Sequence, residues 1–295
     1  MINDYKKFCA QDFNKIYDRL YEKQLKKTRA KNPKLVAERY AQKEAIKESF
    51  KNSLNKYSKE IEAADLWRAI YVAYLKKKSK LSGMINMDDA KEEIIEKVVS
   101  AAQSWKTASG HAFESVICDS INPIFEKTDE QYGIKFILQK ELNDWFNKGL
   151  IGNNPKHKEW LRKCIKSSDF DVYAITEYAG KFYVFGCIQA KTSIRERVSR
   201  DREPSQEAMN LEFWSIAIVL DDEFLSNPKY IDMVNGGQSY KQNGWHGMYT
   251  FSSHNANDRI YPVGEGFKIL ISHAIQAADQ FMSRGNLKND WKAKI

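Results

Sequence analysis

Apolar residues recur every three or four positions through the first 105 residues, which is the spacing of amphipathic helices. Polar, mostly basic stretches at residues 26–34 and 76–80 interrupt the pattern. The apolar stripes cover four segments: Tyr5–Leu25, Val36–Leu54, Ile61–Leu75 and Ile94–Trp105. We therefore predict an all-helical amino-terminal domain over residues 1–105, whose aromatic side chains form a core rather than a surface for stacking bases.

After Thr107 the pattern becomes that of an α/β domain over residues 106–295. Ser109-Gly110-His111 has the composition of a helix start. Two runs rich in β-branched and aromatic residues, 170–178 and 181–191, are separated only by Ala179-Gly180 and predict a hairpin. Further elements are expected at these positions: a helix over 204–211, a buried strand over 213–220, a strand near 247–251 and a closing helix over about 267–282.

Bulk composition excludes several classes of protein. No apolar run approaches the roughly 18 residues that a membrane-spanning helix needs, and residues 1–7 lack the apolar core of a signal peptide. Because Cys9, Cys118, Cys164 and Cys187 have no paired spacing, neither a zinc ribbon nor a disulfide framework is expected. These features favour a cytoplasmic protein.

The net charge of +8 is confined to the amino-terminal third. Residues 1–105 hold 23 of the 47 Lys and Arg residues and 15 of the 39 Asp and Glu residues, so the whole excess lies there and the remaining 24 of each sign balance. Such a surface is compatible with phosphate binding, and a solvated lysine-rich helical exterior explains it equally well. Charge alone therefore leaves nucleic-acid binding open, with Lys76–Lys78 as a candidate contact.

The predicted hairpin carries the residue types that phosphodiester hydrolysis requires. That reaction needs a divalent cation held by carboxylates, an activated water and a positive charge near the phosphate. Asp171 lies on the first strand, and Lys191 ends the second strand on the same face as Gln189, which is a poor metal ligand. Asp169 alternates onto the face of Asp171. We favour Asp171 as the metal ligand because it lies deeper in the apolar run.

The segment that follows Lys191 makes the pattern specific. Arg195-Glu196-Arg197 combines arginines, which fork onto guanine O6 and N7, with a carboxylate that accepts from cytosine N4. With Asp171, Gln189-Ala190-Lys191 and Arg200–Pro204, this triplet resembles the type II restriction endonucleases of the PD-(D/E)xK superfamily that read CCGG-containing sites. The similarity runs through most of the chain, is weaker in the helical third, and includes three further segments: Ser109–Glu114, Phe185–Gln189 and Asn243–Tyr249.

The resemblance implies a magnesium site. In this group the second metal carboxylate lies on the helix that follows the lysine, so Asp171 and Glu203 would hold Mg²⁺ and Glu203 would compensate for Gln189. Glu207 lies one helical turn later and is the alternative to Glu203. Glu114 would supply an auxiliary carboxylate from the helix that precedes the hairpin.

The resemblance also assigns roles to the basic residues. Lys191 would orient the nucleophile or stabilise charge, while Arg195, Glu196 and Arg197 would read bases. Arg200, Asp201 and Arg202 would either contact phosphates or brace the site through ion pairs. Trp245-His246, in a glycine-framed loop, is interpreted equally well as a DNA contact or as a structural turn.

The fold implied by the resemblance is a mixed β-sheet flanked by helices, joined to an all-helical amino-terminal domain that serves DNA contacts or dimerisation. The implied activity is cleavage of double-stranded DNA at a palindrome with a CCGG core flanked by A or T, leaving 5′-phosphate and 3′-hydroxyl ends. The implied protein is a homodimer of the bacterial cytoplasm. Two other functions stay open: a repair-type nuclease with little sequence preference, and a catalytically silent DNA-binding protein.

Overall fold

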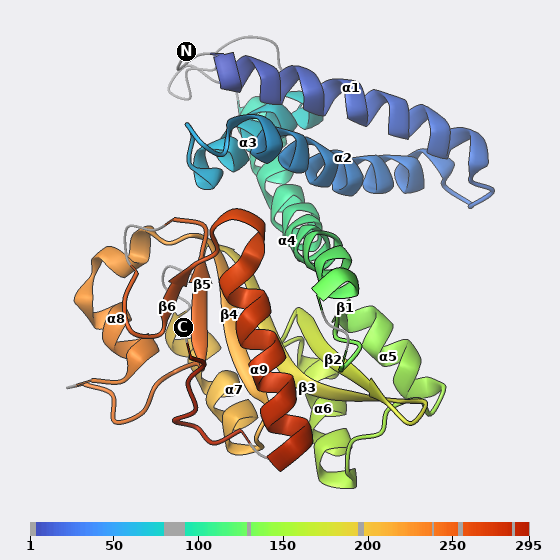
Figure 1. Cartoon of the computed structure of the whole chain (residues 1–295). Coiled ribbons are helices and arrows are strands. Elements are labelled where there is room, and N and C mark those ends of the chain that lie inside the picture. The colour runs from blue at the N-terminus through green and yellow to red at the C-terminus, as the bar shows by residue number, and fades with distance from the viewer. Residues whose placement is uncertain are drawn as a thin grey trace. The chain divides into compact units, whose positions relative to one another are not determined.

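The computed structural model describes residues 4–79, 92–128, 131–193, 198–237, 239–252, 256–284 and 287–294. The chain forms two compact units, Met1–Val116 and Ile117–Ile295 (Figure 1). The division falls inside one helix, α4 (Glu92–Thr128), whereas the sequence placed a boundary between residues 105 and 106. None of the described helices combines the length and hydropathy that crossing a membrane requires.

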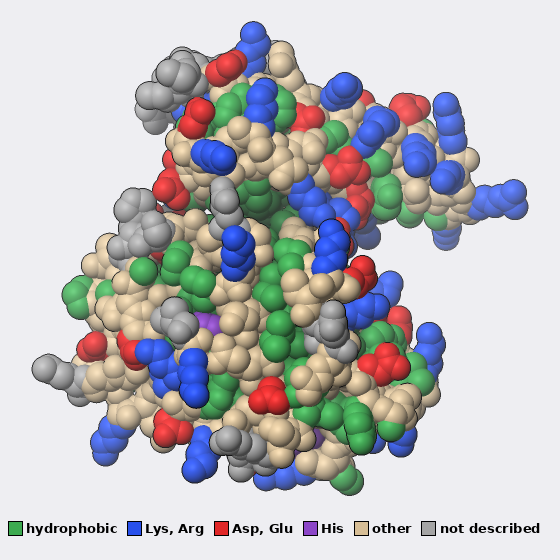
Figure 2. All heavy atoms as spheres, in the orientation of Figure 1, with side chains coloured by type: hydrophobic (Ala, Val, Ile, Leu, Met, Phe, Trp, Pro, Cys, Tyr) green, Lys and Arg blue, Asp and Glu red, His purple; other side chains and the backbone are tan. Residues whose placement is uncertain are grey.

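The amino-terminal unit is helical, as the apolar stripes predicted. It contains α1 (Asp4–Lys27), α2 (Pro33–Tyr57), α3 (Ala63–Ser79) and the first part of α4. The Asn32 side chain caps α2 by accepting from the Leu35 N–H, with Pro33 in the first turn. Phe13, Phe50, Trp67 and Tyr74 are buried between the helices. Lysine and arginine side chains gather at the far end of the α1–α2 hairpin (Figure 2).

The predicted helix start at Ser109 is wrong, because α4 runs through Ser109 and Gly110 without a break. Trp105 and Phe113, on either side of these residues, both pack edge-on against Trp67, with ring centroids 5.6 Å and 6.0 Å apart. Glycine inside a helix costs only about 1 kcal/mol relative to alanine. Burial of the two flanking aromatic side chains outweighs that cost and keeps the helix continuous.

The carboxy-terminal unit is built on a six-stranded sheet, which confirms the predicted mixed sheet flanked by helices. The strands lie in sequence order, antiparallel from β1 to β3 and parallel from β3 to β6. The strands are β1 (Lys135–Leu138), β2 (Val172–Tyr178), β3 (Lys181–Ser193), β4 (Trp214–Asp221), β5 (Gly247–Thr250) and β6 (Ile260–Pro262). The hairpin, the buried central β4 and β5 were predicted, whereas the short edge strands β1 and β6 were not.

The β2–β3 hairpin has the two-residue turn that the sequence indicated. Ala179 and Gly180 both have positive φ, 50° and 70°, as in a type I′ turn, whose twist matches that of the strands. Val172 pairs with Ile188, and the Asp171 N–H donates to the Ile188 carbonyl at 3.0 Å. This register places Asp171 beside the end of β3 that carries Lys191.

Helices cover both faces of the sheet (Figure 1). Leu142, Leu161 and Ala208, from three helices, share a core with Tyr173 and Cys187 of the hairpin. On the other face, Phe281 packs against Phe185, with centroids 6.4 Å apart. Besides the end of α4, the described helices of this unit are α5 (Gln139–Asn147), α6 (Pro155–Ser167), α7 (Val198–Asn210), α8 (Pro228–Asn235), α9 (Lys268–Arg284) and two short 3-10 helices, Glu223–Ser226 and Glu265–Phe267.

Candidate active site

Asp171 and Lys191 meet at the open end of the hairpin. The Lys191 Nζ donates to Asp171 Oδ2 at 2.8 Å, and the Ala190 backbone N–H donates to the same oxygen at 2.9 Å. Both side chains are about one-fifth exposed, 20% for Lys191 and 19% for Asp171. The site thus holds a carboxylate and an ammonium group in a fixed geometry at the solvent boundary, where a phosphate group can reach them.

Asp169 has a different environment from Asp171. Its carboxylate accepts from the Ser167 hydroxyl at the end of α6, and its backbone carbonyl faces the Gln189 side chain. The strand begins only after Asp171, so the expected alternation of the two aspartates along one strand does not apply. Of the two carboxylates, the structure places that of Asp171 against Lys191.

Gln189 does not face solvent. Its side chain is 1% exposed and makes hydrogen bonds to the Asp201 carbonyl at 2.8 Å and to the Trp245 indole N–H at 2.8 Å. The Asp201 carbonyl belongs to the first turn of α7. The amide therefore joins β3 to that helix and is not directed at a metal position.

Helix α7 begins earlier than predicted, at Val198 rather than Pro204. Val198 is fully buried and anchors the start of the helix in the core. Because the helix begins at Val198, Pro204 lies inside it. Glu203 and Glu207 are both exposed and lie one turn apart on the same face. The Trp160 indole N–H donates to Glu207 at 3.3 Å. Within the described part of the chain, Glu203 makes no hydrogen bond or ion pair.

The donor chemistry at this end of the sheet fits a magnesium ion. Asp171 and Glu203 offer hard carboxylate oxygens, and Mg²⁺ is commonly bound by one or two carboxylates, with water and phosphate oxygens completing its coordination. Among the described residues, no group of three or more His, Cys, Asp or Glu side chains is arranged to hold a metal.

Four predicted site residues lie outside the described residues or in the other unit. Arg195, Glu196 and Arg197 fall outside the described residues. Glu114 belongs to the amino-terminal unit, where its side chain is 16% exposed and lies 3.3 Å from His111 Nδ1.

The three residues of the Arg200-Asp201-Arg202 triplet have different environments. Arg202 donates to the Met233 and Gln242 carbonyls at 3.3 Å and 2.7 Å, and its guanidinium lies 4.9 Å from the centre of the Tyr240 ring. Burial lowers the pKa of Arg202 from its usual value. These contacts hold α7 against α8 and the segment that follows it. Arg200 is exposed, and the Asp201 backbone binds Gln189.

Trp245 and His246 are buried, which favours a structural role for this loop over a DNA contact. Trp245 is 0% exposed and His246 is 2% exposed. The Ser215 N–H donates to His246 Nδ1 at 3.0 Å, and Nε2 lies 2.9 Å from the Lys288 carbonyl. Burial lowers the pKa of His246 to about 4, so the ring is neutral at physiological pH and links β4 to the carboxy-terminal segment around Lys288.

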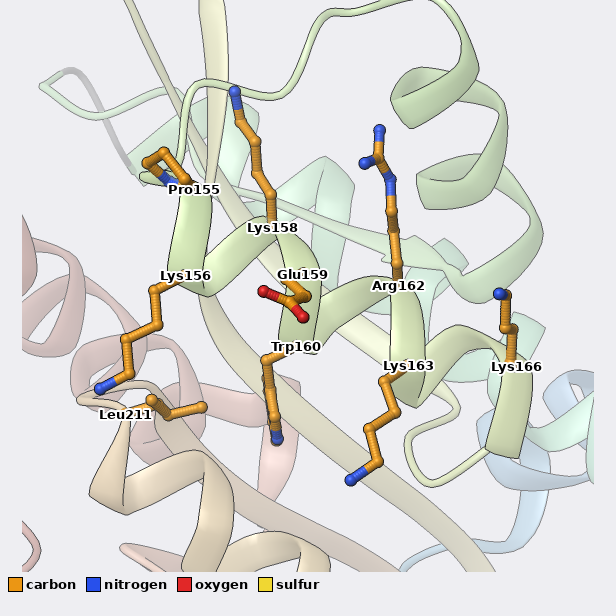
Figure 3. A pocket seen from close by; sticks show the side chains of 9 residues that line it. All are labelled: Pro155, Lys156, Lys158, Glu159, Trp160, Arg162, Lys163, Lys166 and Leu211. Atoms are coloured by element: carbon orange, nitrogen blue, oxygen red, sulfur yellow. The ribbon is translucent and has the colours of Figure 1, made fainter.

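A basic groove along α6 was missed by the sequence analysis (Figure 3). It has a volume of about 910 Å³, and its one acidic residue is Glu159. Lys158 and Arg162 extend to one side of the helix, and Lys156 and Lys163 to the other (Figure 3). The groove is lined by Pro155, Lys156, Lys158, Glu159, Trp160, Arg162, Lys163, Lys166 and Leu211. Five basic residues among the twelve from Pro155 to Lys166 were the available signal.

Comparisons with known proteins indicate the family to which this chain belongs. A family model described as BsaWI restriction endonuclease type 2 matches residues 156–286. The crystal structure of a pre-specific BsaWI–DNA complex is similar over 98% of both chains, with 39% sequence identity and a TM-score of 0.65. No curated protein is significantly similar in sequence.

A second similar structure supports the fold. The specific AgeI–DNA complex matches 88% of this chain and 91% of the AgeI chain, with 19% identity and a TM-score of 0.51. The fold of this chain is similar to the folds of two restriction endonucleases, and the 39% identity to one of them spans nearly the whole chain. The chain therefore belongs to the BsaWI family of type II restriction endonucleases, which are site-specific DNA-cleaving enzymes.

Proposed function

We propose that this protein is a magnesium-dependent endonuclease that cuts double-stranded DNA at a palindrome with a CCGG core flanked by A or T, leaving 5′-phosphate and 3′-hydroxyl ends. The observation that carries the proposal is the Asp171–Lys191 pair, 2.8 Å apart on the hairpin of a chain that is 39% identical to BsaWI. The family supplies the class of reaction, and the CCGG site rests on the Arg195-Glu196-Arg197 triplet.

In the proposed reaction Asp171 and Glu203 would hold the cation, and Glu114 would serve as an auxiliary carboxylate. A bound Mg²⁺ would supply Lewis acidity toward the scissile phosphate and the attacking water. Lys191 keeps the Asp171 carboxylate oriented and presents an ammonium group where negative charge develops. The backbone N–H of Ala190 holds the same carboxylate oxygen, so the hairpin fixes the geometry before DNA binds.

The proposed assembly is a homodimer, because two copies related by a twofold axis match the two halves of a palindrome. Each subunit would cut one strand. The helical amino-terminal unit would serve DNA contacts or dimerisation, and its excess of basic residues supports a role next to phosphates.

A digest of plasmid DNA with the purified protein and Mg²⁺ tests this function directly. We expect discrete fragments whose sequenced ends fall within one CCGG-containing palindrome. A smear would indicate a nuclease with little sequence preference, and a gel shift without cleavage would indicate a silent DNA-binding protein. Discrete ends at an unrelated palindrome would retain the restriction activity and remove the CCGG assignment.

The basic groove leads to a prediction about salt. Lys158 and Arg162 make no ion pair with a described residue, whereas Lys77 and Lys78, which the sequence singled out, pair with Asp18 and Glu38. If Lys158 and Arg162 contact phosphates, changing both to Gln should reduce the slope of log K against log salt by about 1.8, because each contact contributes about 0.9. Fluorescence anisotropy in Ca²⁺ across a salt series measures that slope.

Two controls accompany this measurement. Lys135→Gln with Lys181→Gln removes two exposed charges from the turn side of the sheet and should leave the slope unchanged. The Lys77→Gln and Lys78→Gln pair should also have little effect, because each lysine already has an acidic partner. An unchanged slope in the α6 variant would make the groove an ordinary solvated surface.

A further inference from the structure

Gln189 lies two residues before Lys191, where many nucleases of this superfamily carry a metal-binding carboxylate, yet its side chain is fully occupied inside the protein. Nε2 donates to the Asp201 carbonyl at 2.8 Å and to the Asp169 carbonyl at 3.4 Å. Oε1 accepts from the Trp245 indole N–H at 2.8 Å. A primary amide has two N–H donors and one carbonyl, so both donors and the acceptor are used.

The three backbone segments joined at this amide are those that carry the proposed catalytic groups. Asp169 lies two residues before Asp171, and Asp201 lies two residues before Glu203. Gln189 itself lies two residues before Lys191. One buried side chain thus links the start of β2, the end of β3 and the first turns of α7.

The surroundings of position 189 suit an amide and not a carboxylate. The Trp245 indole nitrogen can only donate, so it fixes Oε1 on its own side and turns the NH₂ group toward the two carbonyls. The backbone of Trp245 is held in turn, because the Asn243 side chain donates to the Trp245 carbonyl at 2.8 Å, and the Trp245 side chain is fully buried. A carboxylate in this position would set an acceptor oxygen against the carbonyl acceptors, without a donor to join them.

We propose that Gln189 is a positioning residue, whose hydrogen bond to α7 fixes Glu203 relative to Asp171 and Lys191. At this position the chain therefore carries a structural link between β3 and α7 in place of a metal-binding carboxylate. The inference rests on the proposed magnesium-dependent cleavage. It explains how the metal carboxylate can lie on a helix and still meet the hairpin with defined geometry. Displacing a catalytic group by about 1 Å can cost about 10²-fold in rate, so loss of the Gln189 link should slow cleavage strongly.

The test compares two variants that each remove one buried hydrogen-bonding link between α7 and the sheet. Gln189→Met keeps the size of the side chain and removes its hydrogen bonds. Ser205→Ala removes the buried Ser205–Ser215 hydrogen bond of 2.7 Å, which lies one turn further along α7 from Asp201. Thermal unfolding, DNA affinity in Ca²⁺, single-turnover cleavage rate and the Mg²⁺ concentration for half-maximal rate are measured for both.

We expect both variants to lower Tm and to retain the wild-type DNA affinity. Gln189→Met should slow single-turnover cleavage by about 10²-fold and raise the Mg²⁺ requirement, because Glu203 is no longer held in position relative to Asp171 and Lys191. Ser205→Ala should keep the wild-type rate and Mg²⁺ requirement. Equal rates for Gln189→Met and wild type, or equal losses in the two variants, would overturn the proposal. If the wild-type protein itself does not cut, the proposed function has failed instead.

A second substitution separates positioning from ligation. Gln189→Glu should slow cleavage and lower Tm, because its carboxylate faces backbone carbonyls. A metal-ligand role for position 189 requires the opposite, a retained rate with a lower Mg²⁺ requirement, and that result would overturn the proposal. If Gln189→Met does not fold, Trp245→Phe replaces it: loss of the indole N–H frees the amide to rotate and should slow cleavage in the same direction, and a wild-type rate would contradict the proposal.

Discussion

Glu203→Ala, Asp171→Ala and Lys191→Ala should each lower single-turnover DNA cleavage by at least about 10²–10³-fold, the usual effect of removing one group that stabilises developing charge. The carboxylate variants lose a metal ligand, whereas the Lys191 variant loses the ammonium group that holds Asp171 at 2.8 Å. All three should bind cognate DNA in Ca²⁺, which takes oxygen ligands and supports binding without cleavage. Rapid-quench assays and gel shifts on one oligonucleotide measure both properties.

Glu207→Ala is the matched control for Glu203→Ala, because both residues are exposed on the same face of α7. Glu207 accepts from Trp160, so its loss removes one hydrogen bond at the surface and should leave the cleavage rate near wild type. The opposite outcome, normal cleavage by Glu203→Ala and loss of cleavage by Glu207→Ala, would reassign the second metal ligand. Circular dichroism of each variant excludes unfolding as the cause.

Arg195→Ala should lose about 1–3 kcal/mol of discrimination against altered core bases, the value of one bidentate arginine–guanine contact. That loss corresponds to roughly ten- to hundred-fold in the ratio of specific to non-specific affinity. Glu196→Gln should also reduce specificity, because its amide can place a donor against the cytosine N4 donor. Competition binding in Ca²⁺, with oligonucleotides changed at each of the four core positions, measures the loss.

The position dependence of that loss decides the role of the triplet. If Arg195 reads guanine, the penalty should fall on the G·C pairs that it contacts and leave non-specific affinity nearly unchanged. Uniform weakening on every oligonucleotide, with a smaller salt dependence, would show that the triplet binds the DNA backbone. The CCGG assignment would then be withdrawn, while the assignment to restriction endonucleases stands on the similarity to BsaWI.

Periodicity identified most of the elements that bury an apolar face. The three amino-terminal helices, the hairpin, β4 and the closing helix all follow the spacing of their hydrophobic residues. The strands β1 and β6, four and three residues long, and the short helices α5 and α8 were missed, because segments of this length show little periodicity. The predicted break at Ser109 was wrong because local propensity costs less than the burial of Trp105 and Phe113 contributes.

The residue types of the candidate site were set by the sequence alone. Asp171 and Lys191 lie at the same end of the hairpin because a two-residue turn joins two antiparallel strands, which can be deduced from the order of residues, whereas the one-residue register shift between Ala174 and Ile175 was not predicted. The role of Gln189 could not be deduced in this way, because its partners Asp201 and Trp245 are distant in the chain and meet only when α7 and the segment after α8 pack beside β3. Local order thus determined which chemistry the hairpin carries, and tertiary packing decided which buried hydrogen bonds hold it in place.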